Sequence, residues 1–408
     1  MNADCDVLIA GGGMVGASLA VALAALPLRV VVVEAVAMGD PGQPSFDART
    51  TALSRGSHHI LTSLGIWPMV AAQAAPIRKI HVSERGRLGT AVIDAADDGG
   101  EPLGYVVENR VLGAALWSRL AASPAIDVRA PARVTGVQSA PEAITVTVDR
   151  QDGTTPIRTR LLVVADGARS RLRESLGIDA RIRSYGQTAI VGNVAVTADD
   201  GAMAYERFTP DGPLALLPAG GGRRVFILTR RTAAVDAAFD LPDAEFLALL
   251  QQEFGFRLGR FSRLGQRHRY PLELVQAAAI TSHRAVMIGN AAHGLHPVAG
   301  QGYNLGLRDV ATLAELLADQ QAGSSTAIAD AGDPGLLRRY ADWRRPDQKR
   351  VVAFTDGLVR GFDLRTPGPL RGMGLLVFDS LPGAKRLLAR QTMGLAGRRT
   401  RLARGLSL

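Results

Sequence analysis

The amino-acid sequence predicts an α/β fold in which a parallel sheet is interrupted by a second, largely antiparallel sheet and followed by a helical C-terminal region. Three apolar segments, at residues 6–10, 161–165 and 285–288, each end in a glycine or polar turn, as the strands of a doubly wound parallel sheet do. Strand-rich stretches separated by turn signals lie between these segments. With 408 residues, the chain is long enough for two or three domains.

The first apolar strand leads through a glycine turn into a helix over residues 14–26. In this spacing, Gly11 permits a tight turn, Gly13 lets the backbone approach a pyrophosphate, and Gly16 lets helix and strand pack closely. Glu34 closes the next strand at the distance needed to accept hydrogen bonds from a ribose. The pattern predicts a Rossmann-like dinucleotide site but does not distinguish FAD from NAD. Its expected contacts are Gly11, Gly13, Met14, Val15, Gly16 and Glu34.

Residues 7–28 form an uncharged run that is long enough for a membrane-spanning helix. However, three consecutive glycines and Pro27 interrupt the run, and acidic residues precede it where a signal peptide would carry Lys or Arg. We therefore expect a soluble, cytoplasmic protein, with peripheral contact at the inner membrane as an open alternative.

The other two strands of the parallel sheet favour a flavin. Each presents a polar residue at its carboxyl end, where ligands bind in such sheets. The residues at these strand ends are Asp166, Gly167, Gly289 and Asn290. After the second strand, Gly300 and Gly302 open a helix that extends to about residue 320. Its N-terminal N–H groups would stabilise the negative charge that a reduced flavin accumulates around N1.

These motifs resemble the three fingerprints of single-component FAD-dependent aromatic hydroxylases. The match narrows to the ubiquinone-biosynthesis hydroxylases at residues 48–54, 108–110 and 295–306, and residues 206–218 are most similar to the 2-polyprenyl-6-methoxyphenol hydroxylase branch. The resemblance extends over nearly the whole chain. One departure is Asn290, because the broader family has Asp there; Asn keeps the hydrogen-bonding capacity without the charge.

The resemblance implies FAD as the cofactor and adds further contacts to it. Arg49 is expected to contact the flavin or its phosphates, with an ordinary surface arginine as the alternative, and Asn109 and Arg110 match a contact to the pyrophosphate. The other implied cofactor residues are Gly300, Gly302, Tyr303 and Asn304. The residues expected to act in catalysis are Pro297, Gly300, Gln301 and Gly302, with the backbone of Gly300–Gly302 stabilising flavin charge.

The implied activity is FAD-dependent hydroxylation of the aromatic ring of a polyprenylated methoxyphenol in ubiquinone biosynthesis. O2 would be the co-substrate, delivered through a flavin C4a-hydroperoxide that the electron-rich ring attacks. Because the chain has no second glycine fingerprint, NAD(P)H would bind transiently, or another electron donor would serve. Leu214, Leu216 and Pro218 are expected to line the substrate pocket; the alternative is that they belong to the core, since buried strands need such residues anyway.

The implied domain organisation is discontinuous. The FAD-binding domain is expected at residues 1–75, 101–180 and 282–345, the substrate domain at 76–100 and 181–281, and a basic helical C-terminal region at 346–408.

The net charge of +9 is concentrated in the C-terminal region. Residues 346–408 contain 12 Lys+Arg and 4 Asp+Glu, which leaves 35 basic and 34 acidic residues in 1–345. A nearly neutral body argues against a groove that binds nucleic acid. The C-terminal region is expected either to contact anionic lipid or another ubiquinone-biosynthesis enzyme, or to form a helical cap on the FAD-binding domain.

The sequence also limits the alternatives. Cys5 is the single cysteine, which excludes an internal disulfide and a Cys-based metal site, and His293 and His296 lack suitably spaced partners, so no metal site is predicted. Two rival hypotheses remain. One is a paralogous flavin hydroxylase that acts at another ring position or on a soluble phenol, and the other is a non-catalytic protein whose basic tail binds membranes or nucleic acid.

Overall fold

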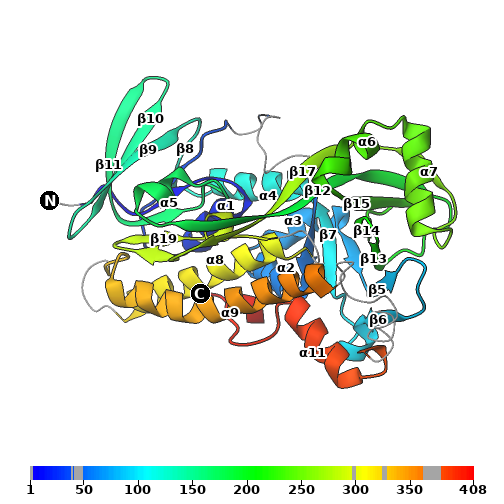
Figure 1. Ribbon diagram of the computed structural model, residues 1–408. Coiled ribbons are helices and arrows are strands. Elements are labelled where there is room, and N and C mark those ends of the chain that lie inside the picture. The colour runs from blue at the N-terminus through cyan, green and yellow to red at the C-terminus, as the bar shows by residue number, and fades with distance from the viewer. Residues whose placement is uncertain (1–2, 38–39, 41–48, 296–299, 324–328, 362–377) are drawn as a thin grey trace.

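The computed structural model describes residues 3–37, 40, 49–295, 300–323, 329–361 and 378–408, which fold into three sheets and the helices around them (Figure 1). Each large sheet contains strands that lie far apart in the sequence, because the chain passes back and forth between the two large sheets.

The first large sheet has the order β18-β19-β11-β1-β2-β8, with β10 and β9 continuing from β11. The pairs of β1 with β2 and β11, of β11 with β19, and of β2 with β8 are all parallel. Because β1 lies between β2 and the much later β11, the strand order reverses beside β1, which is where such sheets bind ligands. The strands are β1 (Cys5–Ala10), β2 (Val30–Val33), β8 (Ile126–Arg129), β9 (Arg133–Ser139), β10 (Ile144–Arg150), β11 (Gly153–Val164), β18 (Thr281–Ser282) and β19 (Ala285–Met287).

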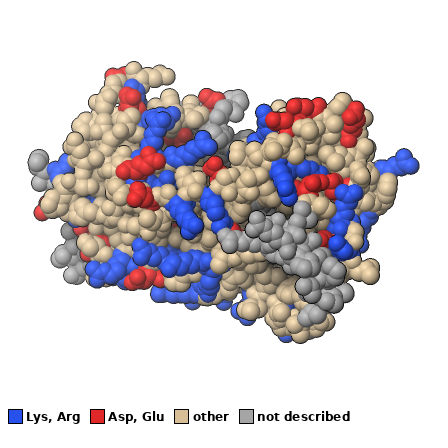
Figure 2. All heavy atoms as spheres, viewed as in Figure 1, with Lys and Arg blue, Asp and Glu red and all other residues tan. Residues whose placement is uncertain are grey.

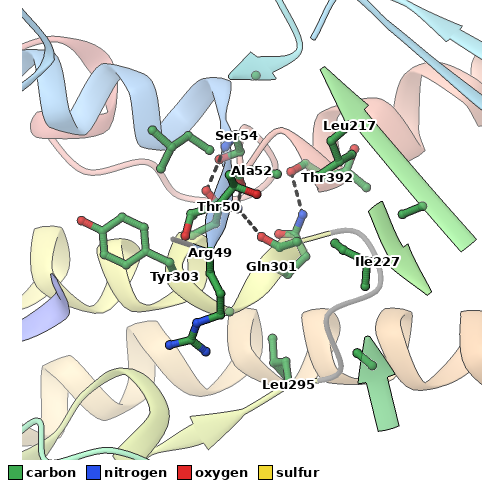
Figure 3. Close-up of a pocket in the computed structure, with 18 of the residues that line it drawn as sticks. Arg49, Thr50, Ala52, Ser54, Leu217, Ile227, Leu295, Gln301, Tyr303 and Thr392 are labelled. Carbon is green, nitrogen blue, oxygen red and sulfur yellow. Dashed lines mark hydrogen bonds between the residues drawn. The ribbon is translucent and has the colours of Figure 1, made fainter. Parts of the chain in front are cut away.

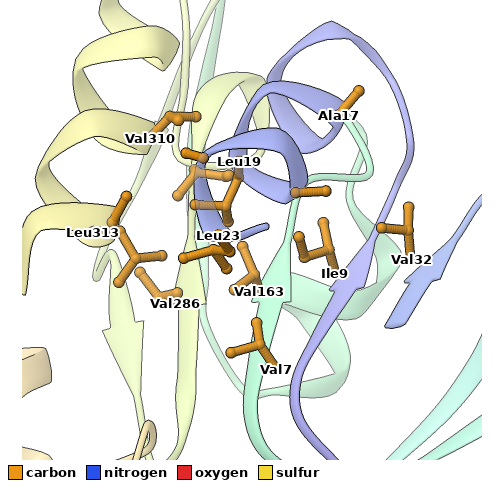
Figure 4. Packing of buried hydrophobic residues seen from close by; sticks show 14 of the residues in the cluster. Val7, Ile9, Ala17, Leu19, Leu23, Val32, Val163, Val286, Val310 and Leu313 are labelled. Atoms are coloured by element: carbon orange, nitrogen blue, oxygen red, sulfur yellow. The ribbon is translucent and has the colours of Figure 1, made fainter. Parts of the chain in front are cut away.

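This sheet is buried against helices, which explains why its central strands are apolar along their whole length. Strands β1 and β2 are fully buried, and α1 (Met14–Leu23) and α8 (Gln301–Ala322) pack against the sheet (Figure 4). The core residues seen there are Val7, Ile9, Ala17, Leu19, Leu23, Val32, Val163, Val286, Val310 and Leu313.

The second large sheet has the order β20-β17-β12-β15-β14-β13-β5-β6, with β16 beside β12. It is antiparallel except for the pair of β13 with β5, as predicted for the inserted sheet. Helices α6 (Val235–Phe239) and α7 (Asp243–Phe254) lie at its far end (Figure 1). The strands are β5 (Lys79–Glu84), β6 (Thr90–Asp94), β12 (Ala180–Val196), β13 (Met203–Thr209), β14 (Gly212–Pro218), β15 (Arg223–Arg231), β16 (Phe261–Leu264), β17 (His268–Ala277) and β20 (His293–Gly294).

A small third sheet and several helices connect the two large sheets. Its strands are β3 (Thr50–Ser54), β4 (Ala75–Ile77) and β7 (Gly104–Glu108). The helices near it are α2 (Arg55–Ser63), α3 (Trp67–Val70) and α4 (Asn109–Ala121), and α5 (Arg171–Ser175) follows β11.

The C-terminal region is helical, as predicted. Helix α9 (Pro334–Gly361) runs without interruption through Pro346, so the expected division between residues 345 and 346 falls inside one helix. The shorter α11 (Pro382–Thr392) follows, and Leu402 and Ala403 beyond it are buried. Among the described residues, no helix is long and apolar enough to cross a membrane.

Candidate active site

A cavity of about 640 Å³ lies where the two large sheets approach the N-terminal ends of α1 and α8. Figure 3 shows the part formed by β3, the start of α8 and the inner face of the second sheet. Most of its lining is apolar, and several of its polar groups come from the start of α8. An apolar cavity with a few convergent polar groups is typical of a cofactor and small-molecule site.

The glycine turn before α1 has the geometry predicted for a pyrophosphate cradle. Gly11 has φ +110°, and a Cβ there would lie 2.5 Å from the Ala165 carbonyl oxygen; at Gly16 a Cβ would lie 1.9 Å from the Gly11 carbonyl oxygen. Helix α1 begins after Gly13, which has no side chain to cap it, so the first N–H groups of the helix are available to an anion. Gly13, Met14 and Val15 line the cavity.

Glu34 lies beside this turn. Its carboxylate accepts hydrogen bonds from the N–H of Gly12 at 2.6 Å and from the N–H of Val36 at 3.0 Å. Trp117 of α4 adds a bond from its indole Nε1 to the Gly12 carbonyl oxygen at 3.1 Å. These contacts fix the carboxylate next to the glycine turn and leave it further acceptor sites for a ribose.

The start of α8 forms a second part of the cavity lining, close to α1, since the Ser18 and Tyr303 hydroxyls are hydrogen-bonded at 2.9 Å. Gly300 precedes the helix with φ +58°, and a Cβ there would lie 3.0 Å from the Cβ of Ala52. Asn304 fixes this turn, because its amide donates to the carbonyl oxygens of Ala52 (2.8 Å) and Gly300 (2.7 Å) and its Oδ1 accepts from the N–H of Ser54 (2.8 Å). The residues of this turn that line the cavity are Gly300, Gln301, Gly302, Tyr303 and Asn304, whereas Pro297 lies outside the described residues.

Arg49, Asn109 and Arg110 take different positions. The guanidinium carbon of Arg49 lies 4.6 Å from the centre of the Tyr270 ring, and Arg49 lines the cavity. Asn109 also lines it and accepts a hydrogen bond from the Thr51 hydroxyl at 2.7 Å. Arg110 is exposed, pairs with Glu108 and does not belong to the described lining of the cavity.

Of the residues predicted at the two later strand ends, Gly167 and Asn290 line the cavity, and Asp166 and Gly289 do not. Gly289 has φ +58°, and a Cβ there would lie 3.1 Å from the methyl carbons of Val15, so this turn packs directly on the start of α1.

A buried ionic network holds the Gly289 turn. The carboxylate of Asp309 accepts bonds from the Gly289 N–H (3.1 Å), His293 Nε2 (2.6 Å), Arg344 Nε (2.7 Å) and Gln348 Nε2 (3.0 Å). Burial opposes ionisation of Asp309, but His293 and Arg344 outweigh it and hold its pKa well below the usual range. His293 therefore belongs to a structural network that joins the cavity floor to α9.

The substrate-pocket assignment needs a correction in strand register. Leu214 and Leu216 are fully buried in the cluster under α7, with Phe226 and Phe246, and Pro218 is also outside the described lining. Their neighbours Ala215 and Leu217 face the cavity instead. Side chains alternate between the faces of a strand, and both faces of β14 are apolar, so the sequence alone could not separate the two sets.

The structure adds two features that the sequence reasoning missed. Leu388, Thr392 and Met393 of the C-terminal region line the cavity, a long-range contact with no local sequence signal. Glu206 on β13 also lines it, and burial raises the pKa of this carboxyl to about 7. The signal in the sequence was an acidic residue that strand alternation places on the same face as Ala204 and Phe208.

The described residues fit FAD: two uncapped helix N-termini line a single cavity, and the glycine cradle with Glu34 lies directly beside the first of them. When bound, the flavin supplies the redox and oxygen chemistry. The chain's own groups would hold the pyrophosphate at α1 and the ring at α8.

Comparisons with known proteins agree with this fit. The model of the FAD binding domain family matches residues 4–355. The chain is 40% identical to the ubiquinone hydroxylase UbiL of Rhodospirillum rubrum, over 99% of this chain and 93% of the relative. It is 33% identical to the 3-demethoxyubiquinol 3-hydroxylase of Escherichia coli, over 97% of this chain and 100% of the relative.

A solved structure shares the fold. The p-nitrophenol 4-monooxygenase PnpA of Pseudomonas putida superposes with a TM-score of 0.77 over 97% of this chain and 99% of that one, at 20% identity. Together with the family match over most of the chain, this similarity confirms the predicted flavin-binding fold. The chain belongs to the FAD binding domain family and, within it, to the FAD-dependent aromatic-ring hydroxylases related to those of ubiquinone biosynthesis.

Proposed function

We propose that this monooxygenase hydroxylates the ring of a polyprenylated methoxyphenol in ubiquinone biosynthesis. The observation that carries the proposal is the shape of the cavity: the uncapped start of α8 faces an apolar sheet wall that includes Ala215, Leu217 and Ile227. A flavin held at the helix end leaves an apolar space for an oily phenol beside it. O2 is the co-substrate, and NAD(P)H or another donor supplies the electrons.

The turn before α8 is assigned the role of charge stabilisation. The N–H groups of Gly300, Gln301 and Gly302 lie at the positive end of a 22-residue helix. Gly11, Gly13 and Glu34 are assigned to the pyrophosphate and ribose, since an anion and hydroxyl groups are what their N–H groups and carboxylate can bind.

Complementation of bacterial strains that each lack one ubiquinone hydroxylase tests the reaction and the ring position. The expected result is rescue of the strain that accumulates a prenylated methoxyphenol, with loss of that intermediate by mass spectrometry. The Escherichia coli relative is named for another position, 3-demethoxyubiquinol, so rescue of that block would move the assignment to it. A chain carrying Gly16→Leu is the inactive control, because a side chain at this position collides with the Gly11 carbonyl.

We further propose that the C-terminal region contacts anionic lipid as well as capping the cavity. Figure 2 shows Lys and Arg gathered along α9, and its exposed basic side chains are Arg338, Arg339, Arg345, Lys349 and Arg350. The basic face thus begins before residue 346. On α11, Leu387 is 70% exposed next to Arg386, a combination that suits the surface of an anionic membrane.

Sedimentation with vesicles tests this contact. Vesicles containing phosphatidylglycerol should bind the protein, and the double change Arg345→Glu and Lys349→Glu should reduce binding by about tenfold or more, since each basic residue near such a surface contributes about 1 kcal/mol. Arg223→Glu with Arg231→Glu, two exposed arginines on β15, is the matched control. Equal binding by both double variants would refute lipid contact through α9 and leave the cap as the role of the region.

A further inference from the structure

Glu206 lies in an otherwise apolar row that crosses the second large sheet. Strand pairing places it between Val82 of β5 and Ala215 of β14, and the row continues through Ile227 of β15 to Val191 of β12. All five side chains line the cavity. Along its own strand the cavity-lining neighbours of Glu206 are Ala204 and Phe208. A carboxyl therefore stands alone in the apolar wall against which a ring substrate would lie.

This position is unfavourable for an ionised carboxylate. Among the described residues no side chain forms an ion pair or a hydrogen bond with Glu206, and burial alone accounts for its raised pKa, to about 7. Burying an unpaired carboxyl costs stability, whereas a leucine or valine would fit this wall. A group that lowers stability and lies in a ligand cavity is a candidate for a role in the reaction.

No other ionisable group of the cavity lies beside Glu206 on the neighbouring strands. The side chains that face it from β5 and β14, Val82 and Ala215, are not ionisable. Tyr205 is tied to Asp200 on the rim of the sheet, and its pKa is raised by burial and by that carboxylate. The remaining titratable or charged lining residues are Arg49, Tyr270, Glu273 and Tyr303.

We infer that Glu206 accepts the proton of the substrate's ring hydroxyl, an inference that rests on the proposed function. The phenolic O–H bond breaks, the proton forms a new O–H bond with a carboxylate oxygen of Glu206, and the electron pair stays on the phenolic oxygen. This step involves no change of oxidation state. It increases electron density at the ring carbon that is hydroxylated, and the proton leaves Glu206 for solvent when the product departs. A base close to pH 7 is suited to such a transfer.

The test compares wild-type holoenzyme with Glu206→Gln on a short-chain prenylated methoxyphenol. Wild-type kcat should rise with pH, reach half its maximum near pH 7 and approach a plateau above about pH 8, as the carboxyl ionises. Glu206→Gln should lower kcat about 100-fold at pH 8 and only about tenfold at pH 6, with a flat profile, because general bases contribute 10²–10⁴ and only a minority of Glu206 is ionised at pH 6. Glu206→Asp should restore part of the pH dependence. Glu245→Gln, an exposed carboxylate on α7, should match wild type.

Binding provides a readout that is independent of turnover. At pH 8 the phenol should bind Glu206→Gln about tenfold more weakly than wild type, since a hydrogen bond to a charged acceptor is lost. The methyl ether of the same substrate has no hydroxyl proton, so it should bind both proteins equally.

Failure of the inference and failure of the proposed function give different results. A wild type that hydroxylates the phenol with a flat pH profile, or a Glu206→Gln variant equal to it in rate and phenol affinity, overturns the role of Glu206 alone. A flavin-loaded wild type that binds and hydroxylates none of these phenols overturns the proposed function, and the inference with it.

Discussion

At the scale of single residues, Glu206 has a thermodynamic signature that is separate from catalysis. Its pKa is raised from 4.5 to about 7 in the folded chain, so between these values the native state binds more protons than the unfolded state. Stability therefore falls as the pH rises through this interval, and the cost of the ionised carboxyl is fully present only above pH 7.

We predict that Glu206→Gln raises the free energy of unfolding at pH 8, by at most about 3 kcal/mol for a shift of this size, and changes it little at pH 4.5. Urea unfolding of both proteins at the two pH values measures the difference. An identical effect at both values would mean that the carboxyl is not held in its neutral form by the fold.

Gly16 offers a second prediction at this scale. Because a Cβ would lie 1.9 Å from the Gly11 carbonyl oxygen, Gly16→Ala should push the glycine turn away from α1 and weaken FAD binding by about tenfold or more, the equivalent of a modest overpacking cost. Flavin retained after gel filtration measures this. Gly357→Ala on α9 is the matched control, since nothing lies within 4 Å of a Cβ there.

At the scale of elements, β14 illustrates both the strength and the limit of pattern reading. A strand at this place in an antiparallel sheet was predicted correctly, because its turn residues and apolar content are local signals. The assignment of its faces was wrong, because an alternating pattern needs a polar face and this strand has none. Leu216 is buried under α7, whereas Leu217 borders the cavity, and neither contact can be predicted from nearby residues in the sequence.

The two faces predict different effects for neighbouring truncations. Leu216→Ala should lower the free energy of unfolding by about 2–5 kcal/mol, the usual cost of a cavity in a packed core. Leu217→Ala should cost less, because its side chain already borders an open cavity, and should change KM for substrates of different ring size. Thermal unfolding and steady-state kinetics on the pair separate these effects; equal destabilisation would show that the faces are misassigned.

At the scale of the whole molecule, the C-terminal region closes the site. Ala389 and Met393 are buried with Ile93 and Leu103, and the Thr392 carbonyl oxygen accepts a bond from the Gln301 amide at 3.2 Å. The sequence raised this cap as one of two readings, and the described contacts support it. We therefore propose that the chain has an FAD-binding domain and a substrate domain, each made of separate segments. The C-terminal region is a third part that packs on both.

A chain that ends at Ser380 should lose FAD faster than the full-length protein, since it lacks one wall of the cavity and the contact to Gln301. Release of flavin fluorescence after dilution follows this rate. A chain that ends at Arg404 removes only residues beyond the buried Ala403 and serves as the control. Equal release from all three chains would show that the C-terminal region does not help to retain the flavin.

Local chemistry explains which parts of the site could be predicted. The glycine turn, Glu34 and the start of α8 could be predicted as site residues because each proposed role demands a residue type at a fixed spacing. Glu206 and Thr392 were missed because their importance depends on strands and helices that meet only after folding. Arg110 is the opposite case. The motif match predicted a contact with the cofactor, but Arg110 pairs with Glu108 and does not line the described cavity.

The strand order of the first sheet also affects when the sheet can fold during synthesis. Its central strand β1 is synthesised first, yet it pairs with β11, and β11 in turn pairs with β19, where Ala285 is opposite Leu162. At ribosomal rates of about 5–20 residues per second, the apolar N-terminal segment waits roughly 14 to 56 s before that last strand emerges. The flavin cradle is thus among the first parts translated and among the last completed. Nascent chains of this enzyme should depend on chaperones more than the length of its domains suggests.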